Sequence, residues 1–123
     1  MIRILLVDDD ALFRKMLRKT LGKMGYEVCE ARDGQEALTS FELVPPDLVV
    51  TDIVMPEKEG LQMIAELRRA HPGVKIIAMS GGGRGSAKDY LVAAKALGAD
   101  RILTKPFSND VLSAAVTSLV GLA

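Results

Sequence analysis

Residues 2–10 read IRILLVDDD, an apolar run that ends in three consecutive aspartates. A short apolar run without polar alternation predicts a strand buried on both faces, which is typical of a parallel sheet covered by helices on either side. Such sheets bind ligands beyond the carboxyl ends of their strands, so the aspartates after Val7 stand where a site is expected. This stretch therefore predicts both an α/β fold and the position of a site.

The rest of the chain repeats this alternation of a short apolar run with a segment of helical spacing. The predicted strands cover residues 2–7, 26–31, 47–51, 74–79 and 101–104. The apolar residues that mark the five predicted helices are Leu12, Met16, Leu17, Leu21 and Met24; Ala37, Leu38 and Phe41; Leu61, Ile64 and Leu67; Tyr90, Leu91, Ala94 and Leu97; and Leu112, Ala115, Val116 and Leu119. Asp10, Asp33 and Ser108 are predicted N-caps, and Gly98 is predicted to end the fourth helix. Five such units predict a flavodoxin-like doubly wound fold, with a five-stranded parallel sheet in the order 2-1-3-4-5 and five helices.

Length and composition limit the classes of function. At 123 residues the chain is expected to form one domain, residues 1–123, with no output domain. Sixteen basic residues balance sixteen acidic ones, which disfavours direct DNA binding. The N-terminal apolar run is too short for a signal peptide or a membrane span, so we expect a soluble cytoplasmic protein without membrane association. Cys29 is the only cysteine, which excludes an internal disulfide and a cysteine-built metal site.

Polar residues stand at the carboxyl ends of four predicted strands. Strand one runs into Asp8, Asp9 and Asp10, and strands three, four and five run into Asp52, Ser80 and Lys105. Carboxylates about 5 to 6 Å apart repel by roughly 3 kcal/mol per pair at an effective dielectric near 20, and a hard cation such as Mg²⁺ relieves this. The set predicts Mg²⁺-assisted phosphoryl transfer to a carboxylate, and Asp52, nearest the centre of the sheet, is the predicted acceptor.

Four segments, ILLVDD, DLVVTDIVMPEKEG, IIAMSG and ILTKPF, together resemble the receiver domain of two-component response regulators over nearly the whole chain. The resemblance implies a signalling switch rather than an enzyme with a separate substrate, phosphorylated by a phosphohistidine of a sensor histidine kinase or a histidine phosphotransfer protein. It implies these roles: Asp52 as phosphoacceptor; Asp8, Asp9, Asp52 and the Val54 carbonyl as Mg²⁺ ligands; Ser80 as switch hydroxyl; and Lys105 as the lysine that contacts the phosphoryl group. A cis peptide bond before Pro106 is also implied.

Two departures from the family pattern affect the expected output. Ile102 occupies a position, three residues before Lys105, where many receivers have an aromatic side chain that reorients. Val54 and Gly82 offer no polar side chain where the family can tune the placement of an attacking water. We therefore hypothesise a comparatively long-lived phosphoryl group.

Rival interpretations use the same aspartates differently. A haloacid-dehalogenase-type phosphohydrolase would use Asp8 as nucleophile and Asp10 as acid, but Leu12 stands where that family favours Thr or Val, and Asp52 would have no role. A flavin carrier would place a phosphate against the three aspartates, which would repel it. A receiver-like interaction module that is never phosphorylated is a further alternative, although all the key residues are present.

Two helices carry possible partner surfaces. The first helix is basic because it carries Arg14, Lys15, Arg18, Lys19 and Lys23. The resemblance implies kinase docking on this helix, and a merely solvated basic face is the alternative. Residues 111–123, VLSAAVTSLVGLA, contain no charge, and Val111 and Val120 fall outside a single apolar stripe. We predict that the surface of the fourth helix, fifth strand and fifth helix binds an unidentified downstream protein or forms a homodimer, the alternative being a small exposed alanine-rich face.

The stretch SGGGRGS, residues 80–86, lacks the spacing of a nucleotide-binding loop. We interpret it as a switch loop in which Ser80 ends the fourth strand and the glycines open the fourth helix. His71 is interpreted as a solvated loop residue rather than a ligand.

Overall fold

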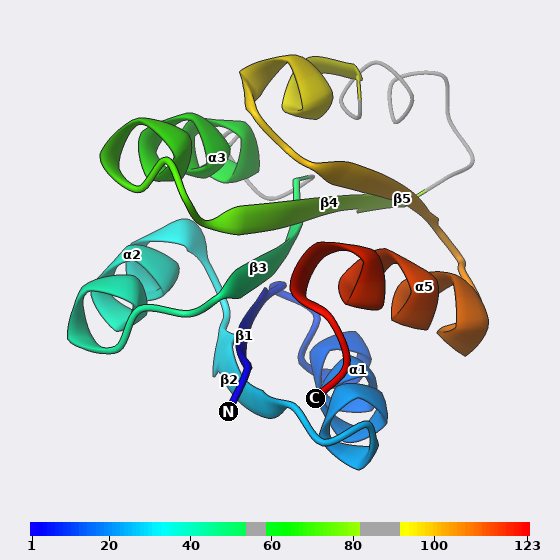
Figure 1. Cartoon of the computed structure of the whole chain (residues 1–123). Helices are drawn as coiled ribbons and strands as arrows, with labels where there is room; N and C mark the ends of the chain where they lie inside the picture. The colour runs from blue at the N-terminus through cyan, green and yellow to red at the C-terminus, as the bar shows by residue number, and fades with distance from the viewer. Residues whose placement is uncertain (54–58, 82–91) are drawn as a thin grey trace.

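A computed structural model describes residues 1–53, 59–81 and 92–123 of the chain (Figure 1). The strands are β1 (Arg3–Val7), β2 (Glu27–Ala31), β3 (Leu48–Asp52), β4 (Lys75–Gly81) and β5 (Arg101–Lys105). The helices are α1 (Ala11–Lys23), α2 (Gly34–Leu43), α3 (Glu59–Ala70) and α5 (Asn109–Val120), and residues 92–97 are also helical. Residues 82–86 of the SGGGRGS stretch lie outside the described part of the chain, as do Tyr90 and Leu91.

The five strands form one parallel sheet in the order β2-β1-β3-β4-β5, which confirms the predicted topology. The strand boundaries agree with the predicted ones to within two residues at each end. The largest difference is in β4, which continues to Gly81, so Ser80 lies within the strand instead of at its end. Ser80 pairs with Thr104 of β5, one residue beyond the last pair of β3 with β4, Asp52 with Met79.

Helices cover both faces of the sheet (Figure 1), and an apolar core lies on each face. Successive side chains of β1 alternate between them: Leu5 and Val7 face α2 and α3, whereas Ile4 and Leu6 face α1 and α5. The central strands are buried on both faces because helices cover both, and this explains why their sequences are continuously apolar. The sheet is therefore the middle layer of a three-layer sandwich.

The predicted caps start their helices. The Asp10 carboxylate accepts hydrogen bonds from the amides of Leu12 and Phe13, both at 3.1 Å. Asp33 accepts from the Glu36 amide at 2.8 Å, and Ser108 accepts from the Val111 amide at 3.1 Å. Gly98 follows the helical residues 92–97 with a φ of +125°, a conformation that favours glycine, as predicted for the end of that helix.

The predicted apolar faces of two helices are partly wrong. On α1, Leu12 and Met16 are exposed by 73% and 59%, and the side chains that pack on the sheet are Phe13, Leu17 and Leu21. In the helical residues 92–97, Leu97 is also exposed, whereas Ala94 is buried as predicted. Both errors arise because apolar residues follow each other closely along these helices, so that the spacing alone does not select one stripe.

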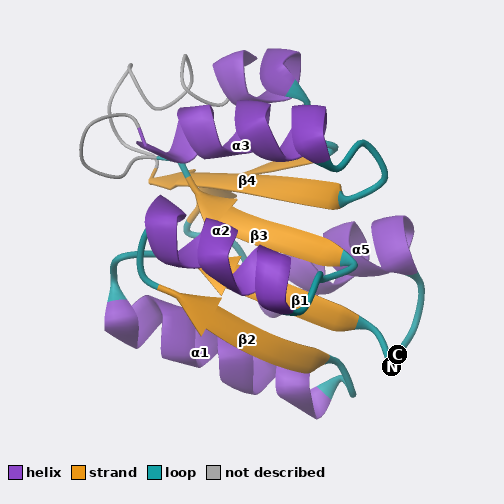
Figure 2. Cartoon of the chain, turned by 90° about the vertical axis from the view of Figure 1, so that its left-hand side faces the viewer, coloured by secondary structure: helices purple, strands orange, loops and turns teal. Residues whose placement is uncertain are grey.

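The two chain termini lie at the edge where the strands begin (Figure 2). His71 lies between the end of α3 and the start of β4, and so belongs to the same edge. Tyr26, just before β2, is buried, and its hydroxyl donates to the Gly121 carbonyl at 2.6 Å, which ties the C-terminal residues to the sheet. Burial raises the pKa of Tyr26. The His71 ring packs on Phe41 with centroids 4.2 Å apart, so this loop residue is half-buried and not fully solvated. In the described part of the chain, no helix combines the length and the apolar character needed to cross a membrane.

Candidate functional site

Three carboxylates meet at the opposite edge of the sheet, where β1 and β3 end. Val7 pairs with Thr51, so Asp8 and Asp52, the next residues on the two strands, lie side by side. Asp8, Asp9 and Asp52 each offer a carboxylate oxygen within 4.8 Å of those of the other two, and we call them the acidic cluster. Asp8 and Asp52 are 1% and 6% exposed, whereas Asp9 is open to solvent. The cluster thus has two buried carboxylates, Asp8 and Asp52, and one carboxylate, Asp9, that solvent can reach.

Lys105, at the end of β5, reaches across to two of these carboxylates. Its Nζ lies 2.9 Å from Asp8 Oδ2 and 3.2 Å from Asp52 Oδ2. Burial, the largest single influence, lowers the pKa of Lys105, but the hydrogen bonds and charges of Asp8 and Asp52 together outweigh it, so the pKa is raised. Lys105 is therefore a protonated counter-ion at neutral pH. The peptide bond between Lys105 and Pro106 is cis, as the resemblance to receiver domains implied.

The Asp8 side chain is fixed from both of its oxygens. Oδ1 accepts a hydrogen bond from the Asp10 amide at 2.9 Å, and Oδ2 faces Lys105. The Asp10 side chain turns away to cap α1. The acid role that a phosphohydrolase would require of Asp10 is thus not favoured, because its carboxylate is already engaged by two backbone amides.

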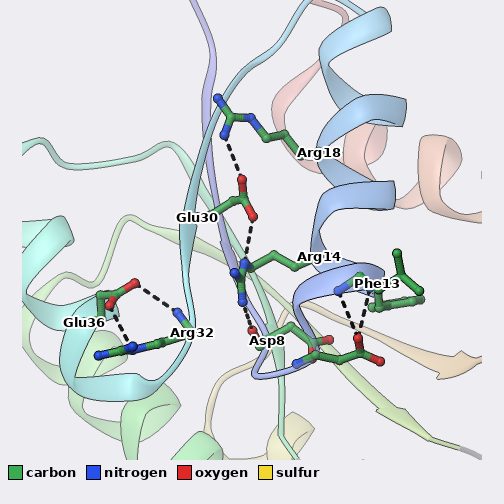
Figure 3. Close-up of polar contacts among 9 residues, drawn as sticks. Asp8, Phe13, Arg14, Arg18, Glu30, Arg32 and Glu36 are labelled. Atoms are coloured by element: carbon green, nitrogen blue, oxygen red, sulfur yellow. Dashed lines mark hydrogen bonds and ion pairs between the residues drawn. The ribbon is translucent and has the colours of Figure 1, made fainter.

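Arg14 and Glu30 support the cluster from α1 and β2 (Figure 3). Arg14 Nε lies 2.7 Å from Glu30 Oε1, and Arg14 Nη1 donates to the Asp8 carbonyl at 2.6 Å. Glu30 also pairs with Arg18 at 2.7 Å, and this bond, reinforced by Arg14, lowers the pKa of Glu30 against the opposing effect of burial. Arg14 is only 14% exposed, so its assignment to an exposed basic face was wrong.

Ser80 and Ile102 lie on the neighbouring strands. Asp52 pairs with Met79, the residue before Ser80, so Ser80 belongs to the same edge of the sheet as the cluster. The Ser80 side chain is fully buried, and its hydroxyl has no hydrogen-bond partner among the described residues. Ile102 is 40% exposed. Val54 and Gly82 lie outside the described residues.

The residues of the cluster fit a small divalent cation. Octahedral Mg²⁺ with oxygens at 2.0–2.1 Å needs ligand oxygens roughly 3 to 4 Å apart, slightly closer than the 4.8 Å limit of the cluster. Carboxylates at that limit repel by at least roughly 3 kcal/mol per pair at an effective dielectric near 20. One ammonium opposes three carboxylates, so negative charge remains. The donor set and its charge therefore suit Mg²⁺, and the exposed Asp9 leaves a side open for waters.

Sequence reasoning missed Gly60 as a part of this site. A Cβ at Gly60 would lie 2.6 Å from Ile53 Cα and 2.8 Å from the Asp52 carbonyl oxygen. The first turn of α3 thus touches the backbone of Asp52, and only glycine fits there. Gly60 ends the segment DLVVTDIVMPEKEG, but nothing in the sequence indicates which backbone it approaches.

Comparisons with known proteins give one consistent result. The sequence model described as "Response regulator receiver domain" matches residues 4–117. The chain is 40% identical over 106 residues to the chemotaxis protein CheY of Thermotoga maritima, covering 85% of this chain and 86% of that protein. It is 38% identical over 119 residues to the response regulator MprA of Mycolicibacterium vanbaalenii, covering 97% of this chain and 50% of that protein.

Solved structures agree. The crystal structure of the receiver domain of NtrX from Brucella abortus superposes with a TM-score of 0.89 at 29% identity, covering 98% of this chain and 99% of that one. The chain spans about half the length of several of the curated relatives that it matches, and most of the length of the chemotaxis protein.

Proposed function

The chain belongs to the family of response regulator receiver domains, and from this premise we propose that it is a switch controlled by phosphorylation of Asp52. The phosphoryl group comes from a phosphohistidine of a sensor histidine kinase or a histidine phosphotransfer protein. The observation that carries the proposal is the acidic cluster, with carboxylate oxygens within 4.8 Å and Lys105 at 2.9 and 3.2 Å from two of its members. Signalling is then the protein's role, and its own phosphorylation and dephosphorylation are the only reactions that it promotes.

Transfer requires one bond to break and one to form. A carboxylate oxygen of Asp52 attacks phosphorus, the bond from phosphorus to the histidine nitrogen breaks, and the electron pair leaves with the imidazole. The Lys105 ammonium, which lies beside Asp52, then contacts the phosphoryl oxygens, where the negative charge increases. The buried Ser80 hydroxyl, which has no hydrogen-bond partner among the described residues, gains an acceptor when a phosphoryl oxygen comes within reach.

Asp8, Asp9 and Asp52, together with the Val54 carbonyl, are the residues that would hold Mg²⁺. When bound, the ion offsets the carboxylate repulsion and the charge of the incoming phosphoryl oxygens. The fit of the three carboxylates to a hard dication supports this assignment. Asp9 is the exposed member of the set and would hold the ion from the solvent side.

We place the docking of the phosphoryl donor on α1, next to the acidic cluster. Leu12 and Met16 are large apolar side chains exposed on one face of that helix, one turn apart. Lys15 and Lys19 are exposed beside them. An apolar patch with basic neighbours suits a helical partner whose own apolar stripe has acidic flanks.

Output passes through the surface of residues 92–97, β5 and α5. Its exposed apolar side chains are Val92, Leu97, Ile102 and Val111. The sequence predicted that Val120 is exposed on this surface, but Val120 is partly buried and packs on the core. Val111→Glu is therefore the better probe. Its loss of partner binding or of dimer, measured by light scattering with and without phosphorylation, supports this surface, and an unchanged oligomeric state with unchanged partner binding contradicts it.

Intact mass after incubation with Mg²⁺ and acetyl phosphate tests the function. The parent is expected to gain one phosphoryl group, and Asp52→Asn to gain none. Retention in Asp52→Asn with loss in Asp8→Asn would favour the phosphohydrolase instead. No added mass in the parent, with this donor or with a phosphorylated kinase, would favour an interaction module that is never phosphorylated.

The lifetime of the phosphoryl group on Asp52 depends on the side chains that can orient the water molecule that hydrolyses it. We propose slow hydrolysis, since Val54 and Gly82 offer no polar side chain to orient the water. Val54→Asn is expected to shorten the lifetime of phosphorylated Asp52, timed by loss of mass after removal of the donor. An unchanged lifetime contradicts this part of the proposal.

A further inference from the structure

Arg14 donates a hydrogen bond to the main-chain carbonyl of Asp8, a member of the acidic cluster, and we propose that it is a positioning residue for the metal ion. Its guanidinium holds the turn between β1 and α1, and with it the carboxylates of Asp8 and Asp9, in the arrangement that binds Mg²⁺. The inference rests on the proposed function, because it concerns the same cluster.

The contacts of Arg14 join three elements. Nη1 donates to the Asp8 carbonyl at the end of β1, at 2.6 Å, while Nε pairs with Glu30 of β2, at 2.7 Å (Figure 3). Arg14 itself belongs to α1. Because the guanidinium is a rigid planar fork, these two bonds fix the first turn of α1 against the ends of both strands.

The Asp8 carbonyl is a sensitive point for such a bond. The Asp8 amide is tied to the Ala31 carbonyl at 3.1 Å, and its carboxylate is held by Asp10 and Lys105. The bond from Arg14 fixes the plane of the peptide between Asp8 and Asp9, and hence the direction in which the Asp9 side chain leaves. Without it, the carbonyl of a residue that is 1% exposed loses its donor.

The charge of Arg14 and its positioning role have opposite effects on Mg²⁺ binding. A guanidinium beside a cation site repels the cation, so its charge alone weakens Mg²⁺ binding. Glu30, which pairs with both Arg14 and Arg18, offsets part of that charge. Removal of Arg14 thus has opposite expected effects: tighter binding if only its charge matters, and weaker binding if it positions the ligands.

Mg²⁺ titration of the unphosphorylated protein by calorimetry separates the two. The titration compares the parent with Arg14→Gln and Arg14→Lys. We expect the Mg²⁺ dissociation constant of each variant to be about 10-fold higher than that of the parent, a typical effect of losing a group that orients a metal ligand. Lysine keeps the charge but cannot make both bonds. Arg18→Gln, the matched control, removes an arginine that is 57% exposed and shares Glu30, and is expected to stay within about twofold because exposed charges are screened.

Exchange of the Asp10 amide, read by NMR without metal, provides a second measurement. This amide donates to Asp8 Oδ1 at 2.9 Å, so it reports the order of the turn. Exchange is expected to be faster in both Arg14 variants and unchanged in Arg18→Gln. If Arg14→Gln proves too unstable to titrate, Arg14→Lys, which keeps the charge, decides, with weaker Mg²⁺ binding expected.

The outcomes are distinct. Equal or tighter Mg²⁺ binding in Arg14→Gln, or parental binding in Arg14→Lys, overturns the positioning role while leaving the proposed function intact. Absence of Mg²⁺ binding in the parent overturns the metal site itself, and the inference with it. Weaker binding in both Arg14 variants, with parental binding in Arg18→Gln, supports it.

Discussion

The Nζ of Lys105 lies 4.1 Å from the centre of the Phe13 ring. Phe13 in turn meets Phe107 edge to face, with centroids 6.0 Å apart and ring planes at 81°. The lysine is thus held between two carboxylates and an aromatic face, where the ring quadrupole attracts the ammonium. Phe13 of α1 is therefore a part of the site, and it limits the positions that the Lys105 side chain can occupy.

Replacement of Phe13 by leucine keeps much of the apolar volume but removes both aromatic contacts. The free energy of unfolding is expected to fall by about 1–2 kcal/mol, and phosphorylation by acetyl phosphate is expected to slow because Lys105 is less confined. Urea unfolding and timed intact mass measure the two effects. Met16→Leu, an exposed change on the same helix, should stay within about 0.5 kcal/mol of the parent. A parental urea midpoint in Phe13→Leu would contradict the prediction.

Arg68 of α3 is expected to be a major stabilising residue. Its guanidinium donates to the carbonyls of Pro72 and Val74, both at 2.7 Å, and of Gly98 at 2.8 Å, and pairs with Asp100 at 2.8 Å. Arg68→Met removes these bonds and should lower the unfolding free energy by about 2–3 kcal/mol. The adjacent, exposed Arg69 gives a matched control in Arg69→Met. Similar losses in the two variants would show that the network contributes little.

Gly60 should tolerate no side chain. Alanine there places a Cβ 2.8 Å from the Asp52 carbonyl oxygen, so either α3 or the end of β3 must shift. We expect Gly60→Ala to cost about 1–3 kcal/mol of stability and to slow phosphorylation. Gly22→Ala is the opposing control: a Cβ at this helical glycine meets no atom within 4 Å, and the change should stabilise by about 0.5–1 kcal/mol. Parental stability and phosphorylation in Gly60→Ala would refute the close approach.

Tyr26 should make the stability sensitive to alkaline pH. Burial raises its pKa above the usual value of 10.0, so the folded state holds the phenol proton more tightly than the unfolded state. The stabilisation is fully present below pH 10.0 and is lost as the pH rises through the folded pKa. Tyr26→Phe, which also loses the bond to Gly121, should cost about 1 kcal/mol at pH 8. That cost should shrink toward pH 11 in urea titrations, whereas a constant cost would contradict the assignment.

Much of the fold follows from the sequence because β1, β3 and β4 are buried on both faces. Short apolar runs such as Ile4–Val7 are typical of buried strands, and the turn residues between the runs mark where each strand or helix ends. The carboxylates and Lys105 were found for the same reason, since each stands directly after or at the end of such a run. Their meeting at one edge is a property of parallel sheets and needs no further information.

Residues that act through tertiary contacts could not be found in this way. Arg14 and Arg68 look like any other arginine on a helix, because a long side chain can lie on the surface or fold back onto backbone carbonyls. Leu12 and Met16 read as core residues, although they point to solvent. The role of Gly60 depends on the close approach of α3 to the end of β3, and the contact of His71 with Phe41 joins the end of α3 to α2. No local sequence pattern records either contact.

The position of the two termini, at the edge where the strands begin, has a practical consequence for engineering. A fluorophore, a tag or a second domain joined to either end would leave the sheet on the side away from the acidic cluster. Because the bond from Tyr26 to Gly121 anchors the C-terminal residues beside β2, a short glycine-rich connection is expected to suffice for circular permutation.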